Sequence, residues 1–242
     1  MLFFFGCPLL SCFKLLSEEG ITIVSKKVNL TTQVYEKIKA KILNNELKPN
    51  EYLDEKQICE QLGVSRTPVR EALVQLEWEG FVVSNPHRGV SVSDLSLPMI
   101  LELIHIRKVM EPELLRPYLK HYSRDVLLDF RAKMSAALEE KDMDMLHDLD
   151  YAFHRYLYEA TKRPHIMKLL SYVCDQSQRI RTQDFYQLRR TEEGAAEHIA
   201  MIDALLAGEY DKVPEMLRAH AASMEEKYYQ NLLDYFQNQG DR

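Results

Sequence analysis

The first hundred residues carry two kinds of hydrophobic spacing. Residues 30–43 repeat apolar side chains every three or four positions, with lysines opposite them, which predicts an amphipathic helix capped by Thr31 or Thr32. A second predicted helix begins at Asp54, whose carboxylate can accept hydrogen bonds from the first turn, and ends at Gly63, a residue that tolerates a left-handed backbone. Two helices separated by a turn are therefore expected in this segment.

A third helix and a β-hairpin follow. Ser65 stands where it can cap the third helix, and Pro68 falls in the first turn, where its missing N–H does no harm. Beyond Gly80 the apolar residues alternate with polar ones on either side of a turn at residues 85–89, which predicts a hairpin. Two helices joined by a tight glycine turn and followed by a hairpin form a helix-turn-helix with a wing.

The rest of the chain has only helical spacing. After a predicted linker at residues 94–98, six helices are expected at about 99–121, 125–140, 143–161, 165–182, 191–207 and 210–238, the last of them open to a break at Pro214. The predicted fold class is therefore mainly α. An N-terminal winged helix-turn-helix (28–93) precedes an all-α antiparallel helical bundle (99–238).

An apolar run, MLFFFGCPLLSCFKLL, opens the chain. It has no basic residue before Lys14 and falls short of the ~20 apolar residues of a spanning helix, so it fits neither a signal peptide nor a membrane span. We interpret residues 1–27 as an extension outside the fold, for example from a start codon assigned too far upstream. The alternative is a peripheral membrane anchor or a lipidated Cys12. The four cysteines lack CxxC or disulfide-framework spacing, so a cytoplasmic protein with reduced thiols and no membrane partner is expected.

Composition and charge narrow the function classes. The 242 residues are 46% hydrophobic and include only 8 glycines and 9 prolines, which excludes disordered, collagen-like and disulfide-rich chains and disfavours a many-stranded sandwich. A net charge of −6 would argue against DNA binding if it were spread evenly. Up to Leu97, however, the chain has 11 basic and 12 acidic residues, against 20 and 25 beyond it. Most of the excess of acidic over basic residues therefore lies in the predicted bundle.

The exposed face of the third predicted helix carries side chains suited to DNA. Arg66 and Arg70 stand four residues apart, with Ser65 and Thr67 beside them. An arginine fork can bond O6 and N7 of guanine in the major groove, whereas serine and threonine suit phosphates. On spacing alone, the same arginines could form the solvated face of a small helical domain.

The segment LGVSRTPVREALVQLEWEGFV, followed by NPHRGVSV, resembles the DNA-binding signature of the GntR family of bacterial transcription factors, from about Leu30 to Val92. The resemblance implies that the family's DNA contacts fall on Arg66, Thr67 and Arg70 of the recognition helix, on Lys56 as a phosphate contact, and on His87, Arg88 and Gly89 of the wing. His87 replaces a residue that is often asparagine in this family, which leaves its base preference open.

Four side chains of the predicted bundle are candidate metal ligands. Asp150 and His154 stand four residues apart on one predicted helix, a pair that is weak evidence by itself. His198 and His220 lie on two later helices, each within an apolar stripe, and imidazoles directed into a bundle need partners. Three neutral imidazoles and one carboxylate suit a divalent ion such as Zn, Ni or Mn.

The segments DYAFH, EHI and RAH resemble the FCD effector-binding domain, the C-terminal half of the FadR subfamily of GntR regulators, over about residues 98–231. In that domain a bundle holds a divalent metal through one aspartate and three histidines, and these positions correspond to Asp150, His154, His198 and His220. The resemblance also implies sensing of small organic acids at the metal. One departure is that Lys162-Arg163-Pro164 replaces Gly-Asn-Pro, which leaves the geometry of that loop open.

Arg107 resembles an arginine that lines the effector pocket in many relatives, where its fork can clamp a carboxylate. The alternative is that Arg107 merely pairs with Glu111, one turn further along the helix.

We therefore expect a homodimeric regulator, not an enzyme, that binds a palindromic double-stranded operator and responds to a small organic acid. Two alternatives remain at this point. One is a metal-independent regulator whose histidines only support the core. The other is a metal-dependent enzyme acting on organic acids, for which His147 and Asp148 are the only evident general bases. The bundle is the expected dimer surface, and Tyr228, Tyr229, Tyr235 and Phe236 are candidates for either that interface or the core.

Overall fold

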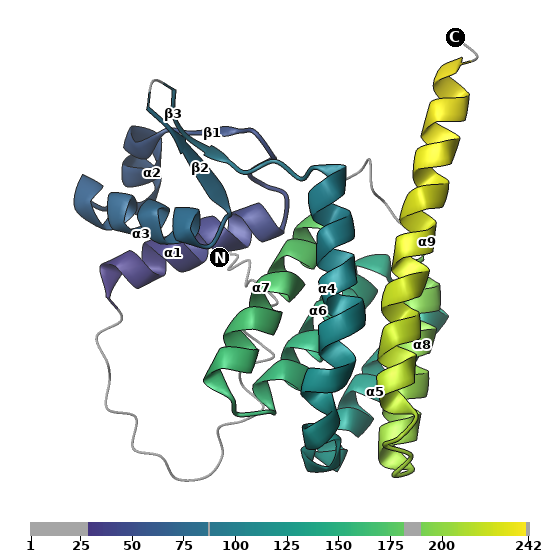
Figure 1. The fold of residues 1–242 in the computed structure, drawn as a ribbon. Coiled ribbons are helices and arrows are strands. Elements are labelled where there is room, and N and C mark those ends of the chain that lie inside the picture. Colours follow the sequence, from purple (N-terminus) through teal and green to yellow (C-terminus); the bar gives the residue numbers. More distant parts are fainter. Residues whose placement is uncertain (1–28, 87, 182–189, 241–242) are drawn as a thin grey trace, which may run out of the picture.

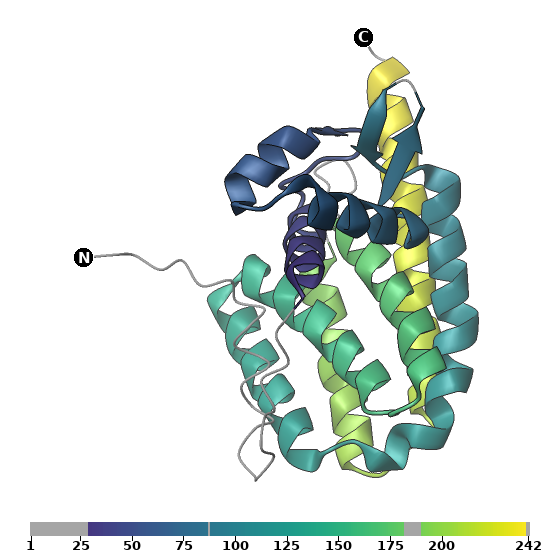
Figure 2. The same ribbon diagram turned by 90° about the vertical axis from the view of Figure 1, so that its left-hand side faces the viewer.

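The computed structural model of the protein describes residues 29–86, 88–181 and 190–240. A small N-terminal domain with a three-stranded sheet lies against one end of a bundle of long helices (Figures 1 and 2). The predicted fold class, a winged helix-turn-helix followed by an all-α bundle, is confirmed.

The N-terminal domain consists of α1 (Leu30–Leu43), β1 (Tyr52–Leu53), α2 (Glu55–Leu62), α3 (Arg66–Trp78), β2 (Val82–Asn85) and β3 (Gly89–Val92). Its strands form an antiparallel sheet in the order β1-β3-β2. Strand β1 was not predicted, because two residues are too short to show an alternating pattern. Tyr52 of β1 pairs with Ser91 of β3, so β1 fastens the start of α2 to the wing.

Some of the helix caps are the residues that the sequence predicts, and one is not. The Asp54 carboxylate accepts hydrogen bonds from the backbone N–H groups of Lys56 and Gln57, and Gly63 ends α2 in the left-handed conformation, both as predicted. The predicted cap of α1 is wrong. Asn29 caps this helix through the N–H of Thr31, while the Thr31 hydroxyl donates to Glu71 of α3 at 2.6 Å.

The bundle contains α4 (Leu97–Leu115), a 3₁₀ helix (Arg116–His121), α5 (Arg124–Glu140), α6 (Met143–Glu159), α7 (Pro164–Arg181), α8 (Thr191–Leu206) and α9 (Val213–Gly240). The first predicted helix of the bundle is thus split at Leu115. Pro117, which lacks an N–H, lies at the start of the 3₁₀ segment and explains the change of helix type. In contrast, α9 is continuous, because Pro214 falls in its first turn.

Packing places α4 between α7 and α9 (Figure 1). Tyr228 of α9 is buried in the cluster these helices share, so it belongs to the core, whereas Tyr229 is 48% exposed. The side chains of Tyr235 and Phe236 lie outside the described residues, as do residues 1–27. Within the described ranges, no helix has the length and hydropathy that crossing a bilayer requires.

Candidate metal centre and DNA-binding face

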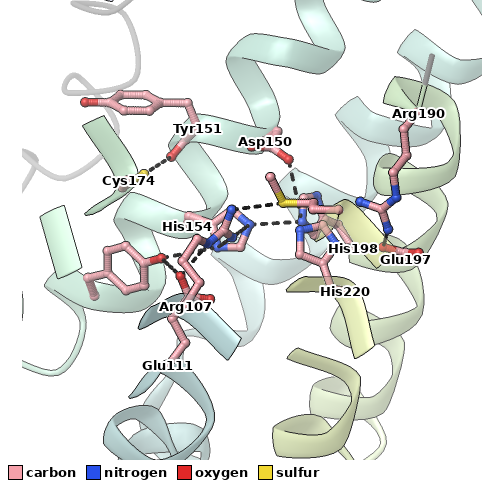
Figure 3. Close-up of polar contacts among 12 residues, drawn as sticks. Arg107, Glu111, Asp150, Tyr151, His154, Cys174, Arg190, Glu197, His198 and His220 are labelled. Atoms are coloured by element: carbon pink, nitrogen blue, oxygen red, sulfur yellow. Dashed lines mark hydrogen bonds and ion pairs between the residues drawn. The ribbon is translucent and has the colours of Figure 1, made fainter. Parts of the chain in front are cut away.

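The four predicted metal ligands come together inside the bundle (Figure 3). Asp150 and His154 project from one face of α6, because residues four apart lie on the same side of a helix. His198 of α8 and His220 of α9 complete the group, and one ligand atom from each of the four residues lies within 4.8 Å of the others. All three histidines are buried. The structure thus brings together residues that are up to 70 positions apart in the sequence.

The contacts within this cluster suit a cation. Nε2 of His154 lies 3.1 Å from Nε2 of His198, which in turn is 3.7 Å from Oδ1 of Asp150. Burial, followed by the neighbouring His198 and Arg107, lowers the pKa of His220 well below its ordinary value, so this imidazole is neutral, as a metal ligand must be. Its buried Nε2 has no hydrogen-bond partner among the described residues. An orphaned imidazole nitrogen facing two more imidazoles and a carboxylate fits a divalent ion.

Arg107 of α4 lies directly beside the cluster. Its side chain is 1% exposed, and its Nε donates to Oε1 of Glu111 at 2.7 Å. A second guanidinium nitrogen, Nη2, lies 2.9 Å from Nε2 of His154, and the Tyr158 hydroxyl donates to the same Glu111 oxygen. Burial opposes the charge of Arg107, but the Glu111 carboxylate outweighs it and raises the pKa of the guanidinium. Arg107 therefore pairs with Glu111 and also faces the candidate metal ligands, while its role toward an effector stays a prediction.

The predicted recognition residues share the exposed start of α3. Ser65, Arg66, Thr67 and Arg70 are all exposed, although Ser65 makes no side-chain cap to α3. Nε of Arg70 donates to Oε2 of Glu55 on α2 at 2.8 Å, a contact that orients the guanidinium.

A shallow concavity of about 240 Å³ lies between these helices and the wing, and it is lined by residues that include Tyr52, Lys56, Arg66 and Gly89. It brings Lys56, predicted as a phosphate contact, together with the recognition helix and the wing. Arg88 is exposed beside it, whereas His87 lies outside the described residues.

Gly89 is required by the fold itself. Its φ is +78°, a backbone conformation that residues with a side chain rarely adopt, and a Cβ at this position would lie 2.6 Å from Cε2 of the exposed Tyr52 ring, which would have to move. Tyr52 is an exposed residue on the same side as the predicted DNA contacts Lys56 and Arg66, and the sequence gave no sign of it, because a two-residue strand is too short to show a pattern.

Comparisons with known proteins decide the family. The family model described as "Bacterial regulatory proteins, gntR family" matches residues 30–92, and the FCD domain model matches residues 102–223. The chain belongs to the GntR family. Its C-terminal half is an FCD domain, which places it with the FadR-like regulators.

One relative is similar to this chain in sequence, and two solved structures are similar to it in fold. The HTH-type regulator YdhC of Bacillus subtilis is 24% identical over 193 residues, which cover 78% of this chain and 86% of YdhC. The structure of McbR/YncC from Escherichia coli has a TM-score of 0.73 at 22% identity, covering 85% and 99% of the two chains. A metal-free FCD domain, that of TM0439, has a TM-score of 0.52 at 20% identity over 59% of this chain and all of that one. The homologues are transcriptional regulators rather than enzymes, so that expectation is confirmed and the enzyme alternative is set aside.

Proposed function

We propose that this GntR-family regulator binds its operator with an affinity set by a small carboxylate effector at a divalent metal ion. The observation that carries the proposal is the meeting of Asp150, His154, His198 and His220 in the buried interior of a domain joined to a helix-turn-helix. Zn, Ni or Mn suits this set of donors. Such an ion, when bound, would supply coordination positions for a carboxylate, and the Arg107 guanidinium beside it would hold that carboxylate by charge-assisted hydrogen bonds.

DNA binding is proposed to use the exposed start of α3 and the wing. Arg66 and Arg70 would contact base edges in the major groove, and Ser65, Thr67 and Lys56 the phosphates, with the wing residues His87, Arg88 and Gly89 at the adjacent groove. A homodimer would place two such surfaces on a palindromic operator. A protein with this role acts on the chromosome, which puts it in the cytoplasm.

Helix α7 offers a physical route between the two sites. The buried carboxylate of Asp175 on α7 accepts a hydrogen bond from the hydroxyl of Tyr151 at 2.7 Å, and Tyr151 follows the candidate ligand Asp150 in α6. The other oxygen of Asp175 lies 2.8 Å from Nζ of Lys39 on α1. Lys39 also reaches Glu79 at 3.2 Å, the residue that caps the C-terminal end of α3.

A second contact joins α7 to the end of the wing. Two nitrogens of the Arg179 guanidinium donate to the hydroxyl and the backbone oxygen of Ser93, at 2.9 Å and 2.7 Å, and Ser93 directly follows β3. Because α7 packs on the ligand-bearing α6 and contacts α1, a shift of α6 on effector binding would be passed to the DNA-binding domain through Asp175 and Arg179.

One alternative, a regulator that needs no metal, is supported by a specific observation. The close approach of His154 to His198 and to Arg107 is also what a purely structural hydrogen-bond network would give, in a regulator that needs no metal.

Metal analysis of wild-type protein and a His198→Ala variant separates these possibilities. The proposal predicts about one divalent ion per wild-type chain after mild purification, because four protein ligands make a tight site. The variant is expected to lose most of that metal and the response to acids found in a thermal-shift screen of carboxylates, while retaining binding to an operator selected from random DNA. Wild-type protein with less than about 0.2 equivalents of metal and intact operator binding would favour the structural network.

A further inference from the structure

His220 is held by a polar group that is not among the four candidate ligands. Its Nδ1 lies 2.6 Å from Oε2 of Glu197 on α8, and its side chain is 2% exposed. Its other nitrogen, Nε2, faces the candidate ligands and has no hydrogen-bond partner among the described residues. The two ring nitrogens of His220 therefore have different surroundings, one against a carboxylate and the other without a hydrogen-bond partner among the described residues.

Glu197 is itself held in place. Arg190, whose side chain is 4% exposed, donates from Nη2 to the same Oε2 of Glu197. Nε of Arg190 donates to the Ser223 hydroxyl on α9 at 3.0 Å, three residues beyond His220. Arg190 and Glu197 thus tie the start of α8 to α9 behind His220. Both helices carry a candidate ligand, so the pair also fixes the separation of His198 and His220.

We propose that Glu197, braced by Arg190, is a positioning residue for the metal site. The inference rests on the proposed function, since it assigns a role toward the same metal. A carboxylate that accepts the Nδ1–H of a ligating imidazole selects the tautomer whose Nε2 lone pair is free and makes that nitrogen a better donor. Glu197 cannot act as a ligand on the face that His198 uses, because consecutive residues of a helix point about 100° apart. It serves the site through His220 instead.

The test compares the zinc affinity of full-length wild-type protein with Glu197→Ala and Glu197→Gln, by competition with a chromophoric chelator. Loss of such an outer carboxylate typically costs about 10- to 100-fold in metal affinity, and this weakening is expected for Glu197→Ala. The glutamine variant is expected to fall between wild type and alanine, because its amide oxygen still accepts the N–H but carries no charge. Glu192→Ala, which removes an exposed carboxylate of the same helix, is the matched control and should bind zinc like wild type.

A second measurement reads the tautomer without metal. In protein labelled with ¹⁵N-histidine, long-range NMR correlations should show His220 protonated at Nδ1 in the wild type and in Glu197→Gln, but with that preference lost in Glu197→Ala. Equal zinc affinities in wild type and Glu197→Ala, with an unchanged tautomer, would overturn the positioning role and leave the metal site standing. A wild-type protein that takes up neither zinc, nickel nor manganese would overturn the metal site, and this proposal with it.

Discussion

Arg70 is the residue on which the DNA-binding proposal can be tested most directly. Its guanidinium is exposed and contacts Glu55 through Nε, and a surface pair of this kind contributes only about 0–1 kcal/mol to folding. Replacing Arg70 with alanine should therefore leave the free energy of unfolding almost unchanged. A bidentate arginine–guanine contact is worth about 1–3 kcal/mol of discrimination, so the variant should lose a large part of its preference for operator over unrelated DNA.

Gel-shift titrations of Arg70→Ala on operator and on unrelated DNA, together with thermal melts, check this expectation. Arg116→Ala removes another exposed arginine, on the 3₁₀ helix, and should bind operator like wild type. If the gel shifts gave Arg70→Ala the same preference for operator over unrelated DNA as wild type, the assignment of α3 as the recognition helix would be refuted.

Single residues could be proposed where a motif constrained them. The i, i+4 pair on α6 was weak evidence by itself, and the resemblance to the FCD domain singled out all four candidate metal ligands, which the fold brings together. Glu197 and Arg190 were missed, because their partners lie on another helix and no periodicity encodes which side chain will reach His220. The cap of α1 was misplaced for a related reason: Asn29 and Thr31 are both good capping residues, and only the backbone path decides between them.

At the scale of elements, hydrophobic spacing predicted every bundle helix to within a few residues at each end, apart from the change to 3₁₀ geometry at Pro117. It did not predict which helix faces would meet. Lys39 lies on the side of α1 that the pattern assigns to solvent, yet its side chain is only 17% exposed because α7 covers it. Contacts between domains escape sequence periodicity, because a helix can bury its polar side against a matching charge.

That contact leads to a prediction for Asp175→Asn. In the wild type, burial lowers the pKa of Lys39, but the charge of Asp175 outweighs it and raises that pKa. Asparagine keeps the size of the side chain and removes this charge. Breaking a fully buried pair costs about 3–5 kcal/mol. Because Lys39 keeps Tyr35 and Glu79 as partners, a loss of about 1–3 kcal/mol in unfolding free energy is expected. The variant should still bind metal, but the acid found in the carboxylate screen should change its operator affinity less than that of wild type.

Operator titrations with and without that acid measure the effect. Asp203→Asn is the matched control, because it breaks an exposed pair with Arg131 between α8 and α5, away from the domain contact. A full-sized acid response in Asp175→Asn would show that the signal does not pass through this carboxylate.

At the scale of the whole molecule, the distribution of charge sets how DNA must be bound. The part of the chain up to Leu97 is close to neutral, and the excess acid lies in the bundle. Since non-specific DNA affinity comes mainly from phosphate neutralisation, a single copy of this domain should bind DNA weakly. Useful affinity then has to come from base contacts and from two domains acting on one operator.

This requirement makes dimerisation a quantitative prediction. Light scattering at micromolar concentration should give a particle of twice the 28.4 kDa chain mass, and a palindromic operator should bind far more tightly than a single half-site. Inserting about five base pairs between the half-sites turns one of them to the opposite face of the duplex, so affinity should fall to the half-site level, while an insertion of about ten should restore part of it. A monomeric particle, or equal affinity for one and two half-sites, would contradict the proposed homodimer on a palindromic operator. A single near-neutral domain would then have to supply all of the binding energy.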